Sequence, residues 1–281
     1  MIERTRIVRG VEVPTFMYGT AWKEDATRAL VERAIGAGFR AIDTANQRKH
    51  YFEAAVGEGV RAAIAAGIVT RDELFLQTKF TFRGGQDHRL PYDPRAPIGE
   101  QVGQSLARSL EHLGVAHVDS LVLHGPVGSR GLAGEDWAAW RAMEEAQARG
   151  ATRLLGVSNV SAEQLDELCG LARVRPAFVQ NRCFASAGWD ARVRAVAARH
   201  DVVYQGFSLL TANGGALGRA EVRAIAARLG RSVPEVIFRF ALALGMIPLT
   251  GTSSDEHMRR DLSVYDLALT DADVAAILAA R

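Results

Sequence analysis

The sequence predicts one α/β domain over residues 1–281, a (β/α)8 TIM barrel with a short N-terminal β-hairpin and additional C-terminal helices. Three observations predict this fold. Short apolar runs alternate with amphipathic segments from end to end, eight such runs can be counted, and 281 residues suit one large α/β domain. A doubly wound sheet would usually carry a glycine-rich fingerprint after its first strand, which Tyr18-Gly19-Thr20-Ala21-Trp22 does not match.

The expected elements follow one another in a regular order. Strands are expected at Phe16–Thr20, Arg40–Asp43, Leu74–Phe80, Val118–His124, Leu154–Ser158, Ala177–Asn181, Val202–Ser208 and Met246–Pro248. Apolar residues at helical spacing predict helices at Asp25–Ala37, Glu53–Ala66, Ile98–Leu113, Glu135–Ala148, Ala162–Ala172, Asp190–Arg199, Ala220–Leu229, Pro234–Leu244, Asp255–Val264 and Asp271–Ala280.

Two local patterns predict a helix start and a hairpin. Ser232-Val-Pro-Glu235 is typical of a helix start, with a capping serine, a proline in the first turn and a glutamate three residues on. Arg6–Val13, with Gly10 at its middle, is expected to form a hairpin that closes the barrel floor.

Composition limits the classes of partner. The net charge of +2, from 34 basic and 32 acidic residues, gives no reason to expect nucleic acid or an anionic membrane as a partner. Two cysteines and an N-terminus without an apolar stretch indicate a cytoplasmic protein. No apolar run approaches the roughly 18 residues of a membrane span. The expected partner is a small-molecule substrate, and the expected state is a monomer or weak homo-oligomer.

Lysine is rare in this chain. Only Lys23, Lys49 and Lys79 occur among the 34 basic residues, so a surviving lysine marks a position where arginine would not serve. Lys79 ends a predicted strand and is the functional candidate. Lys23 and Lys49 are expected at the surface.

Chemistry in such a barrel lies at the C-terminal ends of the strands. Three consecutive apolar strands end in Asp43, Lys79 and His124, which should point toward the same mouth. Singly, the aspartate could cap a helix, the lysine could reach solvent and the histidine could be a core residue. Together they predict that the aspartate and the lysine form a charged pair, and that this pair perturbs the pKa of a neighbouring group. Tyr51, at the start of the following helix, is the candidate proton donor, and a nearby ammonium would lower its pKa.

These residues, with their neighbours, resemble the aldo-keto reductase superfamily over roughly residues 14–278. The resemblance rests on the order and spacing of Gly19-Thr20, Gly38-Phe39-Arg40-Ala41-Ile42-Asp43-Thr44-Ala45, Thr78-Lys79, Asp119-Ser120-Leu121-Val122-Leu123-His124, Gly156-Val157-Ser158-Asn159 and Gln180-Asn181. It implies an NAD(P)H-dependent oxidoreductase that reduces an aldehyde or ketone to an alcohol.

The resemblance also implies roles for particular residues. The catalytic tetrad would be Asp43, Tyr51, Lys79 and His124, with Tyr51 as general acid and His124 orienting the carbonyl. The cofactor, NADPH with NADH as the alternative, would be held by Gly19, Thr20, Ser158, Asn159, Gln180, Phe207, Ser208, Thr252, Ser253 and Arg259. Trp22, Phe80 and Trp137 are the candidate walls of an apolar substrate pocket, and no metal is expected.

The chain departs from the family pattern near the acid and near the phosphate site. The segment from Asp43 to Tyr51 is longer than usual, and a strict count back from Val56-Gly57 places His50 at the acid position. We expect Tyr51 to be presented by a reorganised loop. After the last strand the usual lysine is missing, and His257 stands where an arginine would be. Arg259 or Arg260 could then reach the phosphate.

Two other functions remain open at this stage. A cofactor-binding regulatory or accessory subunit would bind the dinucleotide with little turnover. A metal-dependent barrel of another class ranks last, because no His-x-His pair or His/carboxylate cluster stands at the strand ends.

Overall fold

A computed structural model describes residues 3–281, in which eight parallel strands close into a barrel. The last strand pairs with both the first and the penultimate barrel strand, so the sheet has no open edge. The strands are β3 (Met17–Gly19), β4 (Ala41–Asp43), β5 (Phe75–Phe80), β6 (Val118–Leu123), β7 (Thr152–Ser158), β8 (Phe178–Arg182), β9 (Val203–Phe207) and β10 (Ile247–Thr250). Each overlaps one predicted strand, and the predicted fold is confirmed.

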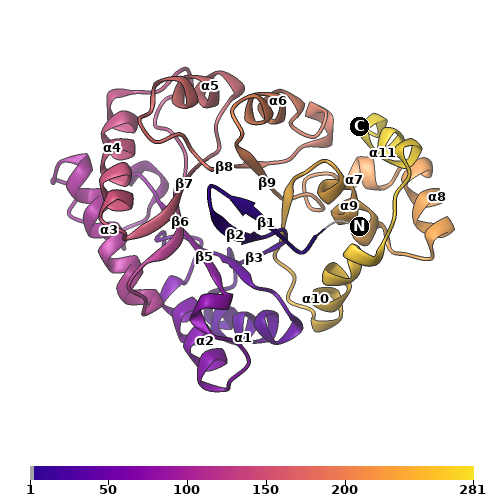
Figure 1. Cartoon of the computed structure of the whole chain (residues 1–281), viewed down its shortest axis with the longest axis horizontal. Helices are drawn as coiled ribbons and strands as arrows, with labels where there is room; N and C mark the ends of the chain where they lie inside the picture. Colours follow the sequence, from indigo (N-terminus) through magenta and orange to yellow (C-terminus); the bar gives the residue numbers. More distant parts are fainter. Residues whose placement is uncertain (1–2) are drawn as a thin grey trace.

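Helices surround the barrel on the outside (Figure 1). They are α1 (Thr27–Ala37), α2 (Glu53–Ala65), α3 (Ile98–Leu113), α4 (Gly134–Ala148), α5 (Ala162–Leu171), α6 (Ala191–Arg199), α7 (Gly214–Leu217), α8 (Ala220–Leu229), α9 (Val233–Ala243), α10 (Asp255–Leu262) and α11 (Asp271–Ala279). Only α7 was not expected, because four residues are too few to show helical periodicity. No helix within residues 3–281 combines the length and apolar character needed to cross a bilayer.

The start of α9 has the predicted cap. Ser232 Oγ accepts from the backbone N–H of Glu235 at 3.5 Å, and the Glu235 carboxylate accepts from the backbone N–H of Ser232 at 2.9 Å. This reciprocal arrangement satisfies two backbone donors that a helix start leaves free.

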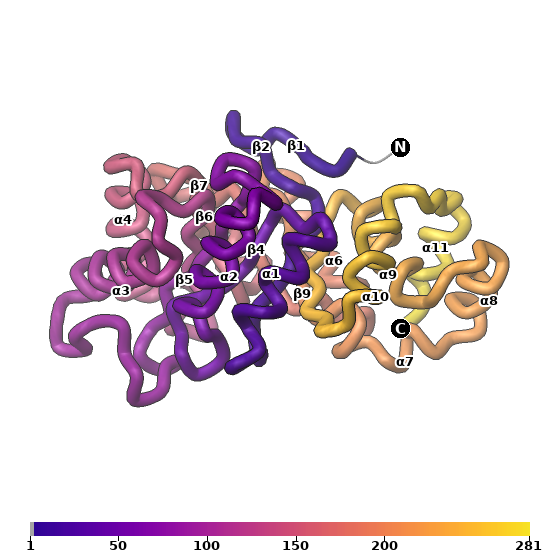
Figure 2. Tube along the Cα trace, turned by 90° about the horizontal axis from the view of Figure 1, so that it is seen from below, coloured from indigo at the N-terminus to yellow at the C-terminus, as the bar shows by residue number. Residues whose placement is uncertain are grey.

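The N-terminal hairpin closes one end of the barrel, as expected. Strands β1 (Thr5–Val8) and β2 (Val11–Pro14) pair antiparallel, and the turn residues Arg9 and Gly10 have φ of 47° and 79°. Positive φ at both positions is what a two-residue hairpin requires. Val8, Val11 and Val13 pack against residues at the beginnings of the barrel strands. Figure 2 shows the hairpin across one end of the molecule, which leaves the opposite end, at the C-terminal ends of the strands, for the site.

Candidate active site

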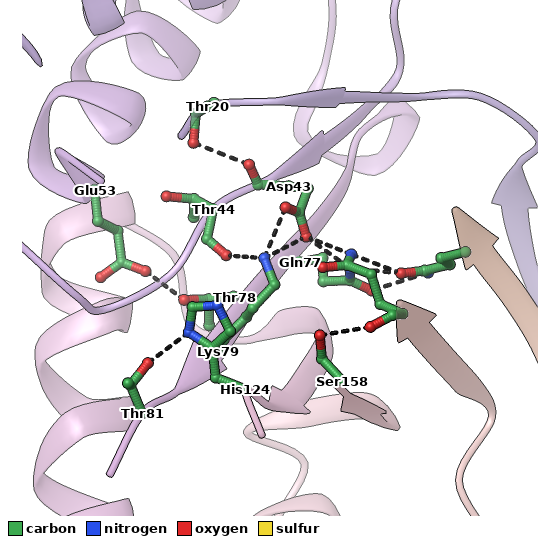
Figure 3. A network of polar contacts seen from close by, with 12 residues as sticks. Thr20, Asp43, Thr44, Glu53, Gln77, Thr78, Lys79, Thr81, His124 and Ser158 are labelled. Carbon is green, nitrogen blue, oxygen red and sulfur yellow. Dashed lines mark hydrogen bonds and ion pairs between the residues drawn. The ribbon is translucent and has the colours of Figure 1, made fainter. Parts of the chain in front are cut away.

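Asp43 and Lys79 form a buried ion pair at the C-terminal ends of β4 and β5. Lys79 Nζ donates to both carboxylate oxygens of Asp43 at 2.7 Å and to the Thr44 carbonyl at 2.8 Å (Figure 3). The Lys79 side chain is 0% exposed and the Asp43 side chain 4%. Burial lowers the pKa of Lys79 from its ordinary value, and the Asp43 carboxylate acts in the opposite direction. The pair therefore places an ammonium in the barrel mouth, held by a carboxylate that water barely reaches.

Tyr51 lies beside this pair and beside His124. Its ring centroid is 5.1 Å from Lys79 Nζ and 5.9 Å from the centroid of the His124 ring. Burial, with a smaller contribution from Asp43, raises the pKa of the phenol well above its usual value. The expectation that Lys79 lowers this pKa is thus wrong for the protein alone, because burial is the largest cause and Asp43 acts in the same direction. The phenol keeps its proton at neutral pH.

The lengthened loop before α2 folds into a turn that presents Tyr51. The carbonyl of Gln47 accepts from the backbone N–H groups of His50 and Tyr51 at 3.1 and 3.0 Å. The Gln47 side chain donates to the Gly85 carbonyl at 2.6 Å, which ties the turn to the loop after β5. The two residues then diverge, since the His50 ring stacks on Trp22 with centroids 4.0 Å apart. The structure therefore places the Tyr51 ring against Lys79 and His124, while the His50 ring lines the same cavity beside Trp22.

His124 follows β6 and is held from both sides. Its Nδ1 lies 2.7 Å from the Thr81 hydroxyl, and its carbonyl accepts from the Asn159 side chain at 2.7 Å. Burial, helped by the charge of Lys79, lowers the pKa of His124 to about 3. The imidazole is therefore neutral above pH 5, with one N–H. When the Thr81 hydroxyl donates to Nδ1, that N–H is on Nε2, the other ring nitrogen.

A cavity of about 750 Å³ extends from these four residues to the beginning of α10. All members of the tetrad except the buried Lys79 line it directly. Trp22, Asn159 and Ser208 also line it, and all three have the left-handed φ that non-glycine residues rarely adopt, at 61°, 55° and 56°. Backbone strain of this kind tends to gather at functional sites.

Most of the expected cofactor residues lie on the cavity wall. Those that do are Gly19, Ser158, Asn159, Gln180, Phe207, Ser208 and Thr252. Thr20 does not, because its fully buried hydroxyl donates to the Asp43 carbonyl at 2.9 Å and links β3 to β4. Ser253 and Arg259 are exposed and lie outside the wall. Helical spacing explains the correction in α10, since residues 257, 260 and 261 share one face and residue 259 falls on another.

Of the three expected substrate residues, only Trp22 lines the cavity, where its side chain is 70% exposed. Phe80 is 1% exposed and packs against Phe82 and Tyr92. Successive strand residues point to opposite sides, so Lys79 points into the barrel and Phe80 out toward the helices. Trp137 packs on the core from α4 and also lies away from the cavity. Phe80 and Trp137 are therefore corrected to packing residues.

The wall of the cavity suits a dinucleotide. At one end, Gln180 offers an amide oxygen that accepts no hydrogen bond from residues 3–281, and Phe207 offers an aromatic ring. At the other end, Thr252, His257 and Arg260 line the cavity beside α10, where the Arg260 guanidinium pairs with Glu256 at 2.8 Å. Burial raises the pKa of Asp261, on the same wall, to about 6.

Several residues of the site were missed by sequence reasoning. Lys23, expected at the surface, is half-buried and donates to the Gly251 carbonyl, which follows β10, the strand next to β3, and both residues line the cavity. Arg182 also lines the wall, and its position two residues after Gln180 on β8 was a usable signal because alternate strand residues share a side. Gln77 and Gln205 are fully buried beside Asp43, and a glutamine inside an apolar strand was the signal in both cases.

Comparisons with known proteins agree with this architecture. The model of the Aldo/keto reductase family matches residues 15–281. An aldo-keto reductase of Mycolicibacterium vanbaalenii is 35% identical over 94% of this chain and 87% of its own length. A morphine 6-dehydrogenase of Pseudomonas putida is 30% identical over 95% of this chain and 88% of its own.

Solved structures show the same fold. The aldo-keto reductase of Bombyx mori in complex with NADP superposes with a TM-score of 0.82 at 24% identity, over 99% of this chain and 93% of that one. An aldo/keto reductase from Brucella melitensis gives 0.83 at 24% identity over the full length of both chains. With the family model covering nearly all of the sequence, this chain belongs to the aldo/keto reductase family of oxidoreductases.

Proposed function

We propose that the protein reduces an aldehyde or ketone to an alcohol with NADPH, through Tyr51, Lys79, Asp43 and His124. One observation carries the proposal: a phenol that keeps its proton lies beside a buried ammonium and a neutral imidazole at the wall of a large cavity. A carbonyl oxygen that gains negative charge needs a proton donor and hydrogen-bond donors already in place.

Tyr51 is the general acid in this proposal. Its raised pKa keeps the phenol protonated while the substrate binds, and the proton leaves the phenol oxygen as charge develops on the substrate oxygen. The ammonium of Lys79 stabilises the phenolate that remains. Asp43 holds that ammonium through both oxygens, so its charge stays at one point of the mouth.

His124 orients the carbonyl. As a neutral imidazole it offers one N–H, and the Thr81 hydroxyl on Nδ1 would direct that N–H from Nε2 toward the cavity. A cationic imidazole would compete with Tyr51 as proton donor. The low pKa of His124 therefore keeps proton donation and carbonyl orientation on separate side chains.

The bound nicotinamide would supply the hydride. The Bombyx mori reductase, at 24% identity, is known in complex with NADP. In this chain we assign the nicotinamide end to Ser158, Asn159, Gln180, Phe207 and Ser208, and the adenosine end to Thr252 and Arg260. Arg260 takes the role expected of Arg259. The cationic side chain favours NADPH over NADH, and titration with both cofactors tests this preference.

Tyr51→Phe tests the acid. Turnover of an aromatic aldehyde, followed by the loss of reduced-nicotinamide absorbance, should fall about 10²–10⁴-fold, which is the usual contribution of general acid catalysis. NADPH binding, followed by protein fluorescence, should be unchanged. Tyr265→Phe is the matched control, because that hydroxyl is buried near Thr15 and outside the cavity.

The outcomes separate the alternatives. Full activity of Tyr51→Phe together with an inactive His50→Gln would transfer the acid role to His50. Tight NADPH binding by the native protein without turnover of any carbonyl compound would favour the accessory-subunit function. Binding of neither cofactor would refute the proposal.

A further inference from the structure

We propose that Gln205 and Gln77 are positioning residues that orient the amide of Gln180, so that its oxygen faces the cavity and accepts an N–H of the nicotinamide carboxamide. The three side chains are called the glutamine relay here (Gln77, Gln180 and Gln205). The inference rests on the proposed function, because it assumes that a nicotinamide cofactor enters the cavity. The question is whether Gln180 presents its amide oxygen or its NH₂ group to the cavity.

The glutamine relay forms a closed network inside the barrel. Gln77 Nε2 donates to Asp43 Oδ1 at 2.7 Å and to Gln205 Oε1 at 2.9 Å. Gln205 Nε2 returns a bond to Gln77 Oε1 at 3.1 Å. Gln180 Nε2 donates to Asp43 Oδ1 at 3.0 Å and to Gln205 Oε1 at 3.0 Å. Figure 3 shows this network beside Lys79, with Gln77 next to Asp43.

Asp43 determines the direction of every bond in the relay. An ionised carboxylate only accepts, whereas each amide can donate from one end and accept at the other. Gln77 must therefore turn its nitrogen toward Asp43, which leaves its oxygen to accept from Gln205. The oxygen of Gln205 then faces Gln180 and accepts from its nitrogen. The amide of Gln180 has no equally good alternative orientation.

The remaining atom of the relay faces outward. Both hydrogens of Gln180 Nε2 are used by Asp43 and Gln205, while Gln180 Oε1 accepts nothing from the part of the chain that is described. Gln180 is also the only member of the relay on the cavity wall, as judged over residues 3–281. Gln77 and Gln205 are 0% exposed. The oxygen is thus an acceptor held ready for a ligand that donates.

Such an acceptor distinguishes ligands by one N–H. A carboxamide supplies it, and the methyl ketone of the 3-acetylpyridine analogue of the cofactor does not. A lost hydrogen bond of this kind is worth about a tenfold change in affinity. If the relay were free to reverse, Gln180 would present its NH₂ group and the advantage of the carboxamide would disappear.

The experiment compares dissociation constants for NADP⁺ and its 3-acetylpyridine analogue by fluorescence titration. The native protein should prefer NADP⁺ by about tenfold. Gln205→Met removes one of the two acceptors of Gln180 Nε2 at nearly constant volume. Asp43 Oδ1 remains as the other acceptor, so the preference should fall to about three-fold. Gln101→Met is the matched control, because Gln101 is a buried glutamine that donates to the Ala96 carbonyl, away from the cavity. Its preference should equal that of the native protein.

A second variant keeps the test independent of the folding of the first. Gln77→Met removes the amide that links Asp43 to Gln205, so Gln205 is free to turn its NH₂ group toward Gln180 and the preference should again fall. A tenfold preference retained by either variant overturns the inference, as does a native protein that binds the two cofactors equally. A native protein that binds neither cofactor refutes the proposed function instead. If Gln205 had only a structural role, its loss would lower the affinities for both cofactors equally and leave their ratio unchanged. That result would also overturn the inference.

Discussion

Removing the charge of Lys79 tests the buried ion pair most directly. Lys79→Met leaves the Asp43 carboxylate 4% exposed and without its cation. Removing one partner of a buried pair costs about 3–5 kcal/mol. Asp43 keeps two donors, from Gln77 at 2.7 Å and Gln180 at 3.0 Å, so the loss should be at the lower end, about 3 kcal/mol at pH 7.

Protonation limits this loss in a way that depends on pH. Protonating a carboxyl that ionises in the usual range costs about 4 kcal/mol at pH 7 and about 1.5 kcal/mol at pH 5. The destabilisation should therefore shrink to about 1.5 kcal/mol at pH 5, because the stranded carboxylate can escape by taking a proton. The free energy of unfolding is measured by urea denaturation at both pH values.

The double variant Lys79→Met/Asp43→Asn provides the decisive comparison. It removes both charges and retains an acceptor for Gln77 and Gln180, so most of the stability should return, to within about 1 kcal/mol of the native protein. An equal loss in the single and double variants would show that packing, and not an unpaired charge, controls the effect. So would a loss in Lys79→Met that is the same at pH 5 and pH 7.

Three further predictions follow from single contacts. Lys79→Arg should lower carbonyl turnover by about two orders of magnitude, because the planar guanidinium cannot replace an ammonium that is 0% exposed. Substantial retained turnover would show that this position does not require a lysine. Asp261→Asn should stabilise the protein by about 3 kcal/mol above pH 7 and not at all below pH 4. Because the pKa of Asp261 is raised to about 6 in the folded protein, its ionised form lowers stability at high pH. A change in unfolding free energy, measured in urea, that does not depend on pH would contradict this. Gly57→Ala should lower stability by about 1–3 kcal/mol, because its Cβ would lie 1.9 Å from the His112 carbonyl oxygen, whereas Gly36→Ala, with nothing within 4 Å, should not.

The sequence alone predicted the barrel and grouped Asp43, Lys79 and His124 at its mouth. Apolar runs and helical spacing are local patterns, and each predicted strand overlaps an observed one. Because the parallel strands of a barrel end at the same mouth, Asp43, Lys79 and His124 could be grouped without coordinates. The extent of the single domain and the roles of the site residues stay predictions.

Only the tertiary structure decided how the site is completed. The position of the Tyr51 ring depends on the Gln47 side chain, which donates to the Gly85 carbonyl, and on the His50 ring, which stacks on Trp22. Both are contacts between distant segments. The same holds for the face that α10 turns to the cavity, where Arg260 lines the wall and Arg259 does not. The Tyr51 pKa is raised where the sequence predicted a lowered one, because the burial of the phenol, which is the largest cause, is a property of packing. Local sequence determines which elements form, whereas contacts between segments far apart in the chain determine what charges and hydrogen bonds meet at their ends.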